Sequence, residues 1–152
     1  MVGENKVVIE RLFNAPVNLV WSIWTEPEFI KIWFGSDPNG RGLSAEIDLS
    51  VGGKYKISFQ DSDGSIHSTF GEYVEIIEFS KLHCSWDWES EAGHVSDLIV
   101  EFIPQGEKTL SILTHSNLNP NSLHGYTKGW NDTMNKIVKK IIENKSLKLI
   151  NP

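Results

Sequence analysis

The most regular hydrophobic pattern in the chain lies near its C-terminus, between about Ser122 and Asn144. Large apolar residues recur there every three or four positions, which places them on one face of an α-helix. These residues are Tyr126, Trp130, Met134, Ile137, Val138, Ile141 and Ile142. The positions between them are mostly lysine and asparagine, including Lys136, and are expected to meet water. We predict one long helix, capped by Asn121 or Ser122, whose apolar face requires a broad partner surface.

The N-terminal pattern predicts a strand followed by two short helices. Val7–Phe13 is rich in the β-branched and large apolar residues that are typical of strands, although Arg11 interrupts the alternation and leaves its faces unassigned. The apolar spacing over Val17–Trp24 then predicts a helix. Thr25–Glu28 has the spacing of a capping box, which predicts a second helix ending near Trp33.

Between residues 45 and 112, short apolar–polar alternations are separated by turn signals, a pattern typical of an antiparallel meander. Gly35–Gly42 is interpreted as a connecting loop and Asp61–Gly64 as a hairpin turn. The first three expected strands are Ala45–Val51, Lys54–Gln60 and His67–Ile77, the last with a bulge near Gly71. Three more strands each present apolar residues on one face: the first Leu82, Cys84, Trp86 and Trp88, the second Leu98, Val100 and Phe102, and the third Leu110 and Ile112.

These strands have one apolar face that must be covered, and the C-terminal helix is the only segment long and apolar enough to do so. The fold prediction is therefore α+β, with seven strands, two short helices after the first strand, and the long helix last.

The length and charge of the chain narrow the functional classes. The 152 residues are expected to form one domain over 1–152, with a folded core at about 6–144 and a frayed tail at 145–152. The net charge of −6 argues against a nucleic-acid binder, which would present a basic surface. No apolar run is long enough to cross a bilayer and the N-terminus lacks signal-peptide features, so we expect a cytoplasmic protein without membrane insertion.

Reactive and metal-binding residues form no recognisable motif. The histidines, at positions 67, 83, 94, 115 and 124, are widely spread and lack the spacing of metal ligands. Cys84 shares the face of Leu82 and Trp86, so a buried and unreactive thiol is expected. We therefore expect no metal, no cofactor and no catalytic residue, and the question of enzymatic activity stays open with a preference for none.

An ordered series of short motifs runs along nearly the whole chain. They are Arg11–Pro16, Val20-Trp21, Trp24–Pro27, Trp33, Asp48, Gly52–Tyr55, Gly71–Tyr73, Thr109-Leu110, His115 and Gly129-Trp130. In this series the chain resembles the activator of heat-shock protein 90 ATPase homologue family, within the START-like (SRPBCC) helix-grip superfamily. The resemblance implies a curved antiparallel sheet of six or seven strands that grips the long C-terminal helix, with an apolar cavity between them. One departure is the loop Phe34–Pro38, where the family commonly has a second Trp and a closer Gly-Pro.

Aromatic residues are numerous for one small domain: six Trp, seven Phe and three Tyr. Taken singly, each is more simply interpreted as part of a filled core. Taken together, large rings on a curved sheet often leave space between them, so the group indicates an apolar binding site. The candidate ligand-binding residues are Trp33, Tyr55, Phe59, Phe70, Trp86, Trp88, Trp130 and Met134.

Three functions follow from the pattern and the resemblance. The first is a cytoplasmic protein, monomeric or homodimeric, that binds an apolar or aromatic small molecule, as lipid-binding and polyketide-binding relatives do. The second is a chaperone co-factor of the stress response. The third is an enzyme that acts on a bound hydrophobic substrate with Asp48, Glu72 or His115.

Overall fold

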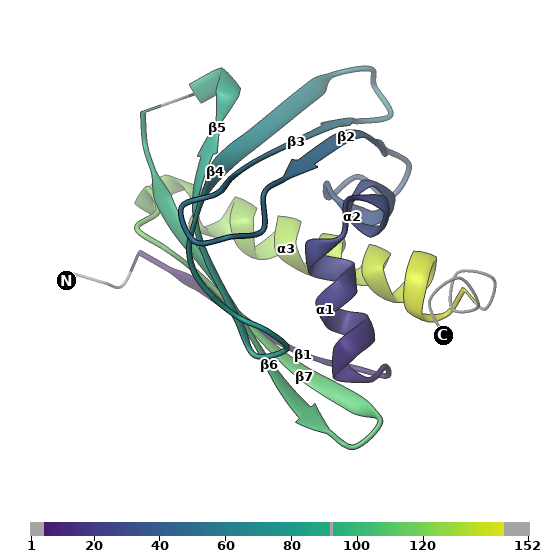
Figure 1. Ribbon diagram of the computed structural model, residues 1–152. Helices are drawn as coiled ribbons and strands as arrows, with labels where there is room; N and C mark the ends of the chain where they lie inside the picture. The colour runs from purple at the N-terminus through teal and green to yellow at the C-terminus, as the bar shows by residue number, and fades with distance from the viewer. Residues whose placement is uncertain (1–4, 92, 145–152) are drawn as a thin grey trace.

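The computed structural model describes residues 5–91 and 93–144. Its fold is α+β: seven antiparallel strands form one curved sheet, and the helices lie on one side of it (Figure 1). The elements are β1 (Val7–Phe13), α1 (Val17–Thr25), α2 (Pro27–Trp33), β2 (Arg41–Ile47), β3 (Lys54–Gln60), β4 (Ile66–Ile77), β5 (Lys81–Trp88), η1 (Glu89–Glu91), β6 (Ser96–Gln105), β7 (Lys108–Ser116), η2 (Pro120–Ser122), α3 (Leu123–Ile137) and η3 (Val138–Ile142). The predicted tail at 145–152 lies outside the described residues. No helix in the described part of the chain is both long and apolar enough to span a bilayer.

The strand order is β1-β7-β6-β5-β4-β3-β2, so β2 to β7 form a meander and β1 joins its far edge by pairing with β7. Alternation on three strands places their apolar residues on the inner face, as the sequence predicts. The buried residues there are Tyr55, Ile57 and Phe59 on β3, Leu82, Cys84 and Trp86 on β5, and Leu98, Val100 and Phe102 on β6. This alternation gives the sheet the apolar face that the helices cover.

The structure assigns the faces of β1. Val7, Ile9 and Phe13 are buried, and Arg11 lies on the same side of the strand. The Arg11 guanidinium reaches helix α3, where Nη1 donates a hydrogen bond to Asn135 Oδ1 at 3.2 Å. Because β1 is an edge strand, a long side chain there can pass the helix and keep its charge in water.

The predicted inner face of β7 is wrong. Leu110 and Ile112 are only half-buried, whereas Thr109, Ser111, Leu113 and His115 have no exposed surface. Two of these polar residues are tolerated inside because their side chains are bonded: Thr109 Oγ1 donates to the carbonyl of Ala15 at 2.8 Å, and His115 is bonded at both nitrogens. A pattern that scores only hydrophobicity cannot identify inward polar residues of this kind.

Two glycines, Gly42 in the predicted loop and Gly71 at the predicted bulge, allow close packing of the backbone instead. β2 begins at Arg41 and ends at Ile47, earlier than the predicted segment, and Gly42 lies within it. A Cβ on Gly42 would lie 2.2 Å from the Lys31 carbonyl oxygen, so only glycine lets β2 pass α2.

On β4, the register shifts between Tyr73 and Glu75 rather than at Gly71. A Cβ on Gly71 would lie 2.0 Å from the backbone of the neighbouring strand.

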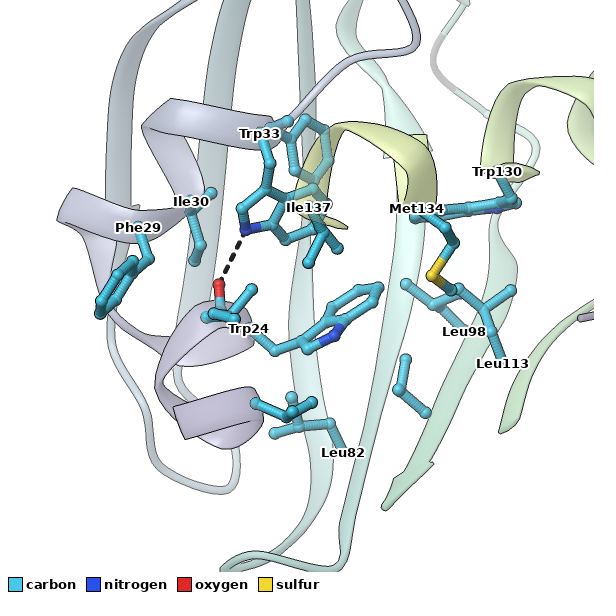
Figure 2. Close-up of a cluster of buried hydrophobic side chains, with 14 of the residues drawn as sticks. Trp24, Phe29, Ile30, Trp33, Leu82, Leu98, Leu113, Trp130, Met134 and Ile137 are labelled. Atoms are coloured by element: carbon cyan, nitrogen blue, oxygen red, sulfur yellow. Dashed lines mark hydrogen bonds between the residues drawn. The ribbon is translucent and has the colours of Figure 1, made fainter. Parts of the chain in front are cut away.

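Helices α1 and α2 share the covering of the sheet with α3, so the prediction that only the C-terminal helix covers it is wrong. Figure 2 shows Trp24 of α1, Trp33 of α2 and Ile137 of α3 gathered in one buried cluster. The Trp33 indole also donates from Nε1 to the Ile23 carbonyl at 2.8 Å, which joins α2 to α1. Tryptophan side chains are large enough to let short helices cover much of a sheet face.

The predicted capping box is absent at the start of α2. Thr25 is the last residue of α1, and its hydroxyl donates back to the Trp21 carbonyl at 2.8 Å. The N-cap residue of α2 is Glu26, which makes no side-chain cap hydrogen bond. Pro27 in the first turn, which has no N–H to satisfy, favours the start of this helix.

The apolar stripe of the long helix is confirmed. Trp130, Met134, Ile137, Ile141 and Ile142 are all buried. The α-helix ends at Ile137 and continues as the π-helical segment η3, whose wider turn allows Ile141 and Ile142 to face the core together. Ser122 is the N-cap residue but makes no side-chain cap hydrogen bond.

Candidate functional site

A cavity of about 340 Å³ lies between the sheet, helix α3 and the segment that follows α2. Its lining residues are Phe34, Gly35, Ser36, Phe59, Trp86, Trp88, Ser122, Gly125, Tyr126, Gly129, Trp130 and Thr133. None of them is an acid, a lysine, an arginine, a histidine or a cysteine. The volume falls within the range of about 300–1,000 Å³ that is typical of small-molecule sites.

Aromatic rings in mutual contact form most of the cavity wall. The ring of Phe34 stacks on Trp86 with centroids 5.9 Å apart and an interplanar angle of 27°. Trp86 in turn contacts Trp130 of α3 and Trp88 of its own strand, and in each pair the ring centroids are 5.4 Å apart. Phe59 on β3 contacts Phe34 at 5.6 Å. Because each ring is held by the next, the wall is a preformed apolar surface.

Helix α3 leaves room for the cavity by presenting small residues to it. Gly125, Gly129 and Thr133 follow one another at intervals of four and lie on one side of the helix. A Cβ on Gly125 would meet no atom within 4 Å, and one on Gly129 would only approach Ser36 Cβ at 3.9 Å. A glycine inside a helix costs roughly 1 kcal/mol relative to alanine. The space beside α3 therefore exists at a cost in helix stability.

The loop at the cavity rim is tied to α3 by Lys136, which is buried and not solvated as the sequence pattern predicts. Its Nζ donates to the carbonyls of Gly35 at 3.1 Å and Asp37 at 2.9 Å. Burial lowers the pKa of Lys136, with a further contribution from Lys140. Apolar spacing cannot identify this role, because a lysine can place its stem against apolar surface and its amine on buried carbonyls.

Asp37 holds the same loop from its other side. Its Oδ2 accepts hydrogen bonds from the backbone N–H and the hydroxyl of Ser62 at 2.8 and 2.7 Å, and Oδ1 accepts from the Asn39 N–H at 2.9 Å. These bonds, first those from Ser62, lower the pKa of Asp37 to about 2. The rim of the cavity is therefore fixed between α3 and the β3–β4 hairpin.

A chain of hydrogen bonds runs behind the aromatic wall. Trp130 Nε1 donates to His115 Nδ1 at 3.1 Å, so the other ring nitrogen, Nε2, carries the proton of the neutral ring. His115 Nε2 then donates to Ser96 Oγ at 2.8 Å, and the Ser96 hydroxyl donates to the Trp86 carbonyl at 3.3 Å. Burial lowers the pKa of His115 to about 3. The histidine is thus a neutral support for Trp86 and Trp130.

Four of the eight predicted ligand-binding residues line the cavity: Phe59, Trp86, Trp88 and Trp130. Trp33 and Tyr55 lie deeper, around a space of only about 40 Å³. Met134 is fully buried in the core one turn beyond Trp130 and lines neither space. Phe70 is half-buried between the inward Thr69 and Gly71, so strand alternation points it away from the helices, and it lines neither space.

Sequence reasoning missed several lining residues. Phe34 falls in the predicted loop and Tyr126 in the predicted helix stripe, and neither is among the predicted ligand-binding residues. The signal for Gly125 and Gly129 was present, since two glycines four positions apart in an amphipathic helix mark a side with no side chains. Ser36, Ser122 and Thr133 carried no signal that separates them from other surface polar residues.

The three candidate catalytic residues, Asp48, Glu72 and His115, do not form a common site. Glu72 is exposed on β4, whereas His115 is fully buried on β7, three strands away in the sheet order. Three strand spacings amount to about 14 Å. Asp48 lies in the β2–β3 turn, where its carboxylate accepts a hydrogen bond from the Ser50 hydroxyl at 2.9 Å.

Cys84 is buried, as expected, and burial raises its thiol pKa to about 12, which keeps it protonated. Within 5–91 and 93–144, no three His, Cys, Asp or Glu residues are grouped so that they could hold a metal ion.

Solved structures with the same fold match nearly the whole chain. Protein NE0264 from Nitrosomonas europaea is 24% identical with a TM-score of 0.77, and the match covers 90% of this chain and 96% of that one. Protein CV1439 from Chromobacterium violaceum is 16% identical with a TM-score of 0.79, covering 92% of this chain and 99% of that one. DynU16, described as a putative protein in the dynemicin biosynthetic locus, is 17% identical with a TM-score of 0.74, covering 90% of this chain and 46% of that one. No protein with a curated description matches the sequence significantly.

The sequence itself matches one family model, described as Activator of Hsp90 ATPase homolog 1-like protein, over residues 14–141. That span holds every described strand after β1 and the helices α1, α2 and α3, and so includes all the residues that line the cavity. The structural matches share the helix-grip arrangement of sheet and long helix. The chain belongs to the Activator of Hsp90 ATPase homolog 1-like protein family.

Proposed function

We propose that the protein binds an apolar small molecule, with aromatic or ring character, in the cavity between the sheet and helix α3. The observation that carries this proposal is the cavity of about 340 Å³ walled by Phe34, Phe59, Trp86, Trp88 and Trp130. A cavity with this wall holds water poorly, because water needs polar partners that the rings do not supply. An apolar ligand would displace that water and contact several rings at once.

The ring contacts also favour a flat ligand. The indoles and phenyl rings meet at close centroid distances and are buried against the core, so the wall is not free to reshape around a bulky molecule. Flat ring systems pack on aromatic side chains through offset stacking or edge contacts. The family and the likeness to DynU16, a protein from a biosynthetic locus, agree with a small-molecule role.

The proposal is tested by titration with the apolar dye N-phenyl-1-naphthylamine, followed by dye fluorescence. Gly129→Leu places a side chain in the cavity from the helix side and should weaken dye binding roughly tenfold or more. Thr127→Leu adds the same kind of side chain on the exposed side of α3 and serves as the control, with unchanged affinity expected. Dye affinity that is equal in the parent protein and in Gly129→Leu, with both folded, would contradict the proposal.

A chaperone co-factor role is the second candidate, and the family membership is what favours it. It is separated from the first by the ATPase rate of a purified heat-shock protein 90. The ligand-binding proposal expects no change in that rate when the protein is added. A rate that rises with the concentration of this protein, and does so equally for Gly129→Leu, would favour the co-factor role.

A further inference from the structure

A second, smaller cavity of about 130 Å³ adjoins the apolar one. The two cavities share four wall residues, which are Trp86, Trp88, Ser122 and Tyr126. On its other side the smaller cavity is lined by polar residues, including Asp87, His94, Ser96 and Asn119. An apolar space therefore lies directly against a polar one.

One hydrogen bond spans the boundary between the two cavities. Trp88 Nε1 donates to Tyr126 Oη at 2.8 Å, which joins the end of β5 to the first turns of α3. Both side chains are half-buried, so neither ring is enclosed by the core. The Trp88–Tyr126 pair therefore stands at the boundary of both cavities.

Asp87 gives the smaller cavity an unneutralised negative charge. The residue is only 6% exposed. Its carboxylate accepts hydrogen bonds from the backbone N–H groups of Trp88 at 2.8 Å and Gly93 at 3.1 Å, and no lysine, arginine or histidine among the described residues forms an ion pair with it. A carboxylate has about four acceptor positions, so about two remain. A buried carboxylate is stabilised by a cation or a further donor.

Ser96 and His94 in this cavity also have acceptors to spare. The Ser96 hydroxyl donates its proton to the Trp86 carbonyl and accepts one hydrogen bond from His115 Nε2. The second lone pair of Ser96 Oγ is therefore free to accept another hydrogen bond. His94 Nε2 donates to the Asn117 carbonyl at 2.8 Å, so Nδ1 of its neutral ring is an acceptor. A ligand group that donates hydrogen bonds matches the acceptors that Asp87, Ser96 and His94 present.

We infer that the ligand is an amphiphile whose ring body occupies the apolar cavity and whose protonated amine enters the smaller cavity beside Asp87. This inference rests on the proposed function and adds the second half of the ligand to it. The Trp88–Tyr126 pair then contacts the chain that joins the two halves. The selectivity lies in the contrast between a wall of rings and a buried carboxylate without a cation.

The test compares two probes that differ only at one end: 2-butylnaphthalene and 4-(2-naphthyl)butylamine, each measured by displacement of N-phenyl-1-naphthylamine at about 0.15 M salt, which screens the net negative charge of the surface. The amine should bind the parent protein about tenfold more tightly than the hydrocarbon, since a hydrogen bond to a buried charge is among the strong ones. Equal affinities would overturn the amine site while leaving the proposed function standing. Failure of both probes to bind would contradict the proposed function itself.

Asp87→Asn should remove the advantage of the amine and leave the affinity for 2-butylnaphthalene unchanged. Asp97→Asn removes an acidic charge on β6 outside both cavities and should keep the advantage. Asn119→Trp provides a second route if Asp87→Asn does not fold, because Asn119 is exposed and makes no side-chain cap hydrogen bond. It should block the smaller cavity and abolish the advantage. An advantage that survives in Asp87→Asn, or in Asn119→Trp when that variant replaces it, would overturn the inference.

Discussion

His115 shows at the residue scale how this protein uses a polar group without exposing it. Both ring nitrogens are bonded, one accepting from Trp130 and one donating to Ser96, and the ring has no exposed surface. Protonation would put a second N–H against the Trp130 N–H, so geometry and burial both favour the neutral ring. The residue matches a family motif position, but its role here is to hold two tryptophans of the cavity wall.

This role predicts a specific pH dependence of stability. The pKa of His115 falls from 6.5 to about 3 on folding, so between these values the unfolded chain binds a proton that the folded chain does not. The free energy of unfolding should therefore be fully retained above pH 6.5 and should fall as the pH drops, by up to about 1.4 kcal/mol per pH unit from this group. Urea titrations from about pH 7 to about pH 4.5 measure the slope. His115→Gln should flatten it, and the same slope in His115→Gln as in the exposed control His124→Gln would refute this account.

Lys136 carries a second prediction at this scale. Lys136→Met keeps the buried stem but leaves the carbonyls of Gly35 and Asp37 without their donor, which should cost about 1–3 kcal/mol of unfolding free energy. Lys139→Met on the exposed side of the same helical region should change stability by less than about 0.5 kcal/mol. Chemical denaturation of both variants makes the comparison, and equal effects would mean that the bonds to the rim loop contribute little.

At the scale of elements, strands and helices differed in how well they could be predicted. β3, β5 and β6 follow apolar–polar alternation, so their faces could be assigned from the sequence. β7 could not, because Thr109 and Ser111 face inward and Leu110 does not. The predicted boundaries of β2 are wrong because Gly42 resembles a loop signal in the sequence, whereas its lack of a side chain lets the strand pass α2. In each case the deciding contact comes from a distant segment of the chain.

Helix α3 combines a core stripe with a side that is kept open. Met134 and Ile137 bind it to the sheet and the other helices, while Gly125 and Gly129 leave the cavity beside it. The stripe could be predicted from apolar spacing. The open side follows from the two glycines only once the position of β3 and β5 opposite them is known.

A side chain added on the open side of α3 should raise the stability of the protein and weaken its binding of the dye. Gly129→Ala should raise the free energy of unfolding by about 1 kcal/mol, because alanine favours the helix and its Cβ meets no close contact. The same methyl group reduces the space beside Trp130, so N-phenyl-1-naphthylamine should bind more weakly. Urea titration and dye titration on one preparation give both values. A variant that is more stable and binds the dye as well as the parent would show that the ligand does not contact this side of α3.

At the scale of the whole molecule, the sheet and helices of residues 5–91 and 93–144 enclose a core and leave a large space beside it. Tyr55 and Trp33 surround the deep part, where only about 40 Å³ remains, while Phe34, Trp86, Trp88 and Trp130 surround the open part. The sequence could predict that many rings would gather between sheet and helix. It could not predict where filling stops and the cavity begins, because that depends on the loop after α2, which Lys136 and Asp37 hold in place.

The most direct test of a ligand site between sheet and α3 uses the indole N–H signals of the six tryptophans in a proton–nitrogen NMR spectrum. Trp86, Trp88 and Trp130 line the cavity, whereas Trp21 packs against Phe79 and Phe102 elsewhere in the structure. On addition of N-phenyl-1-naphthylamine, the signals of Trp86, Trp88 and Trp130 should shift and that of Trp21 should stay in place. A bound dye that shifts Trp21 and leaves the three cavity tryptophans unchanged would contradict the account.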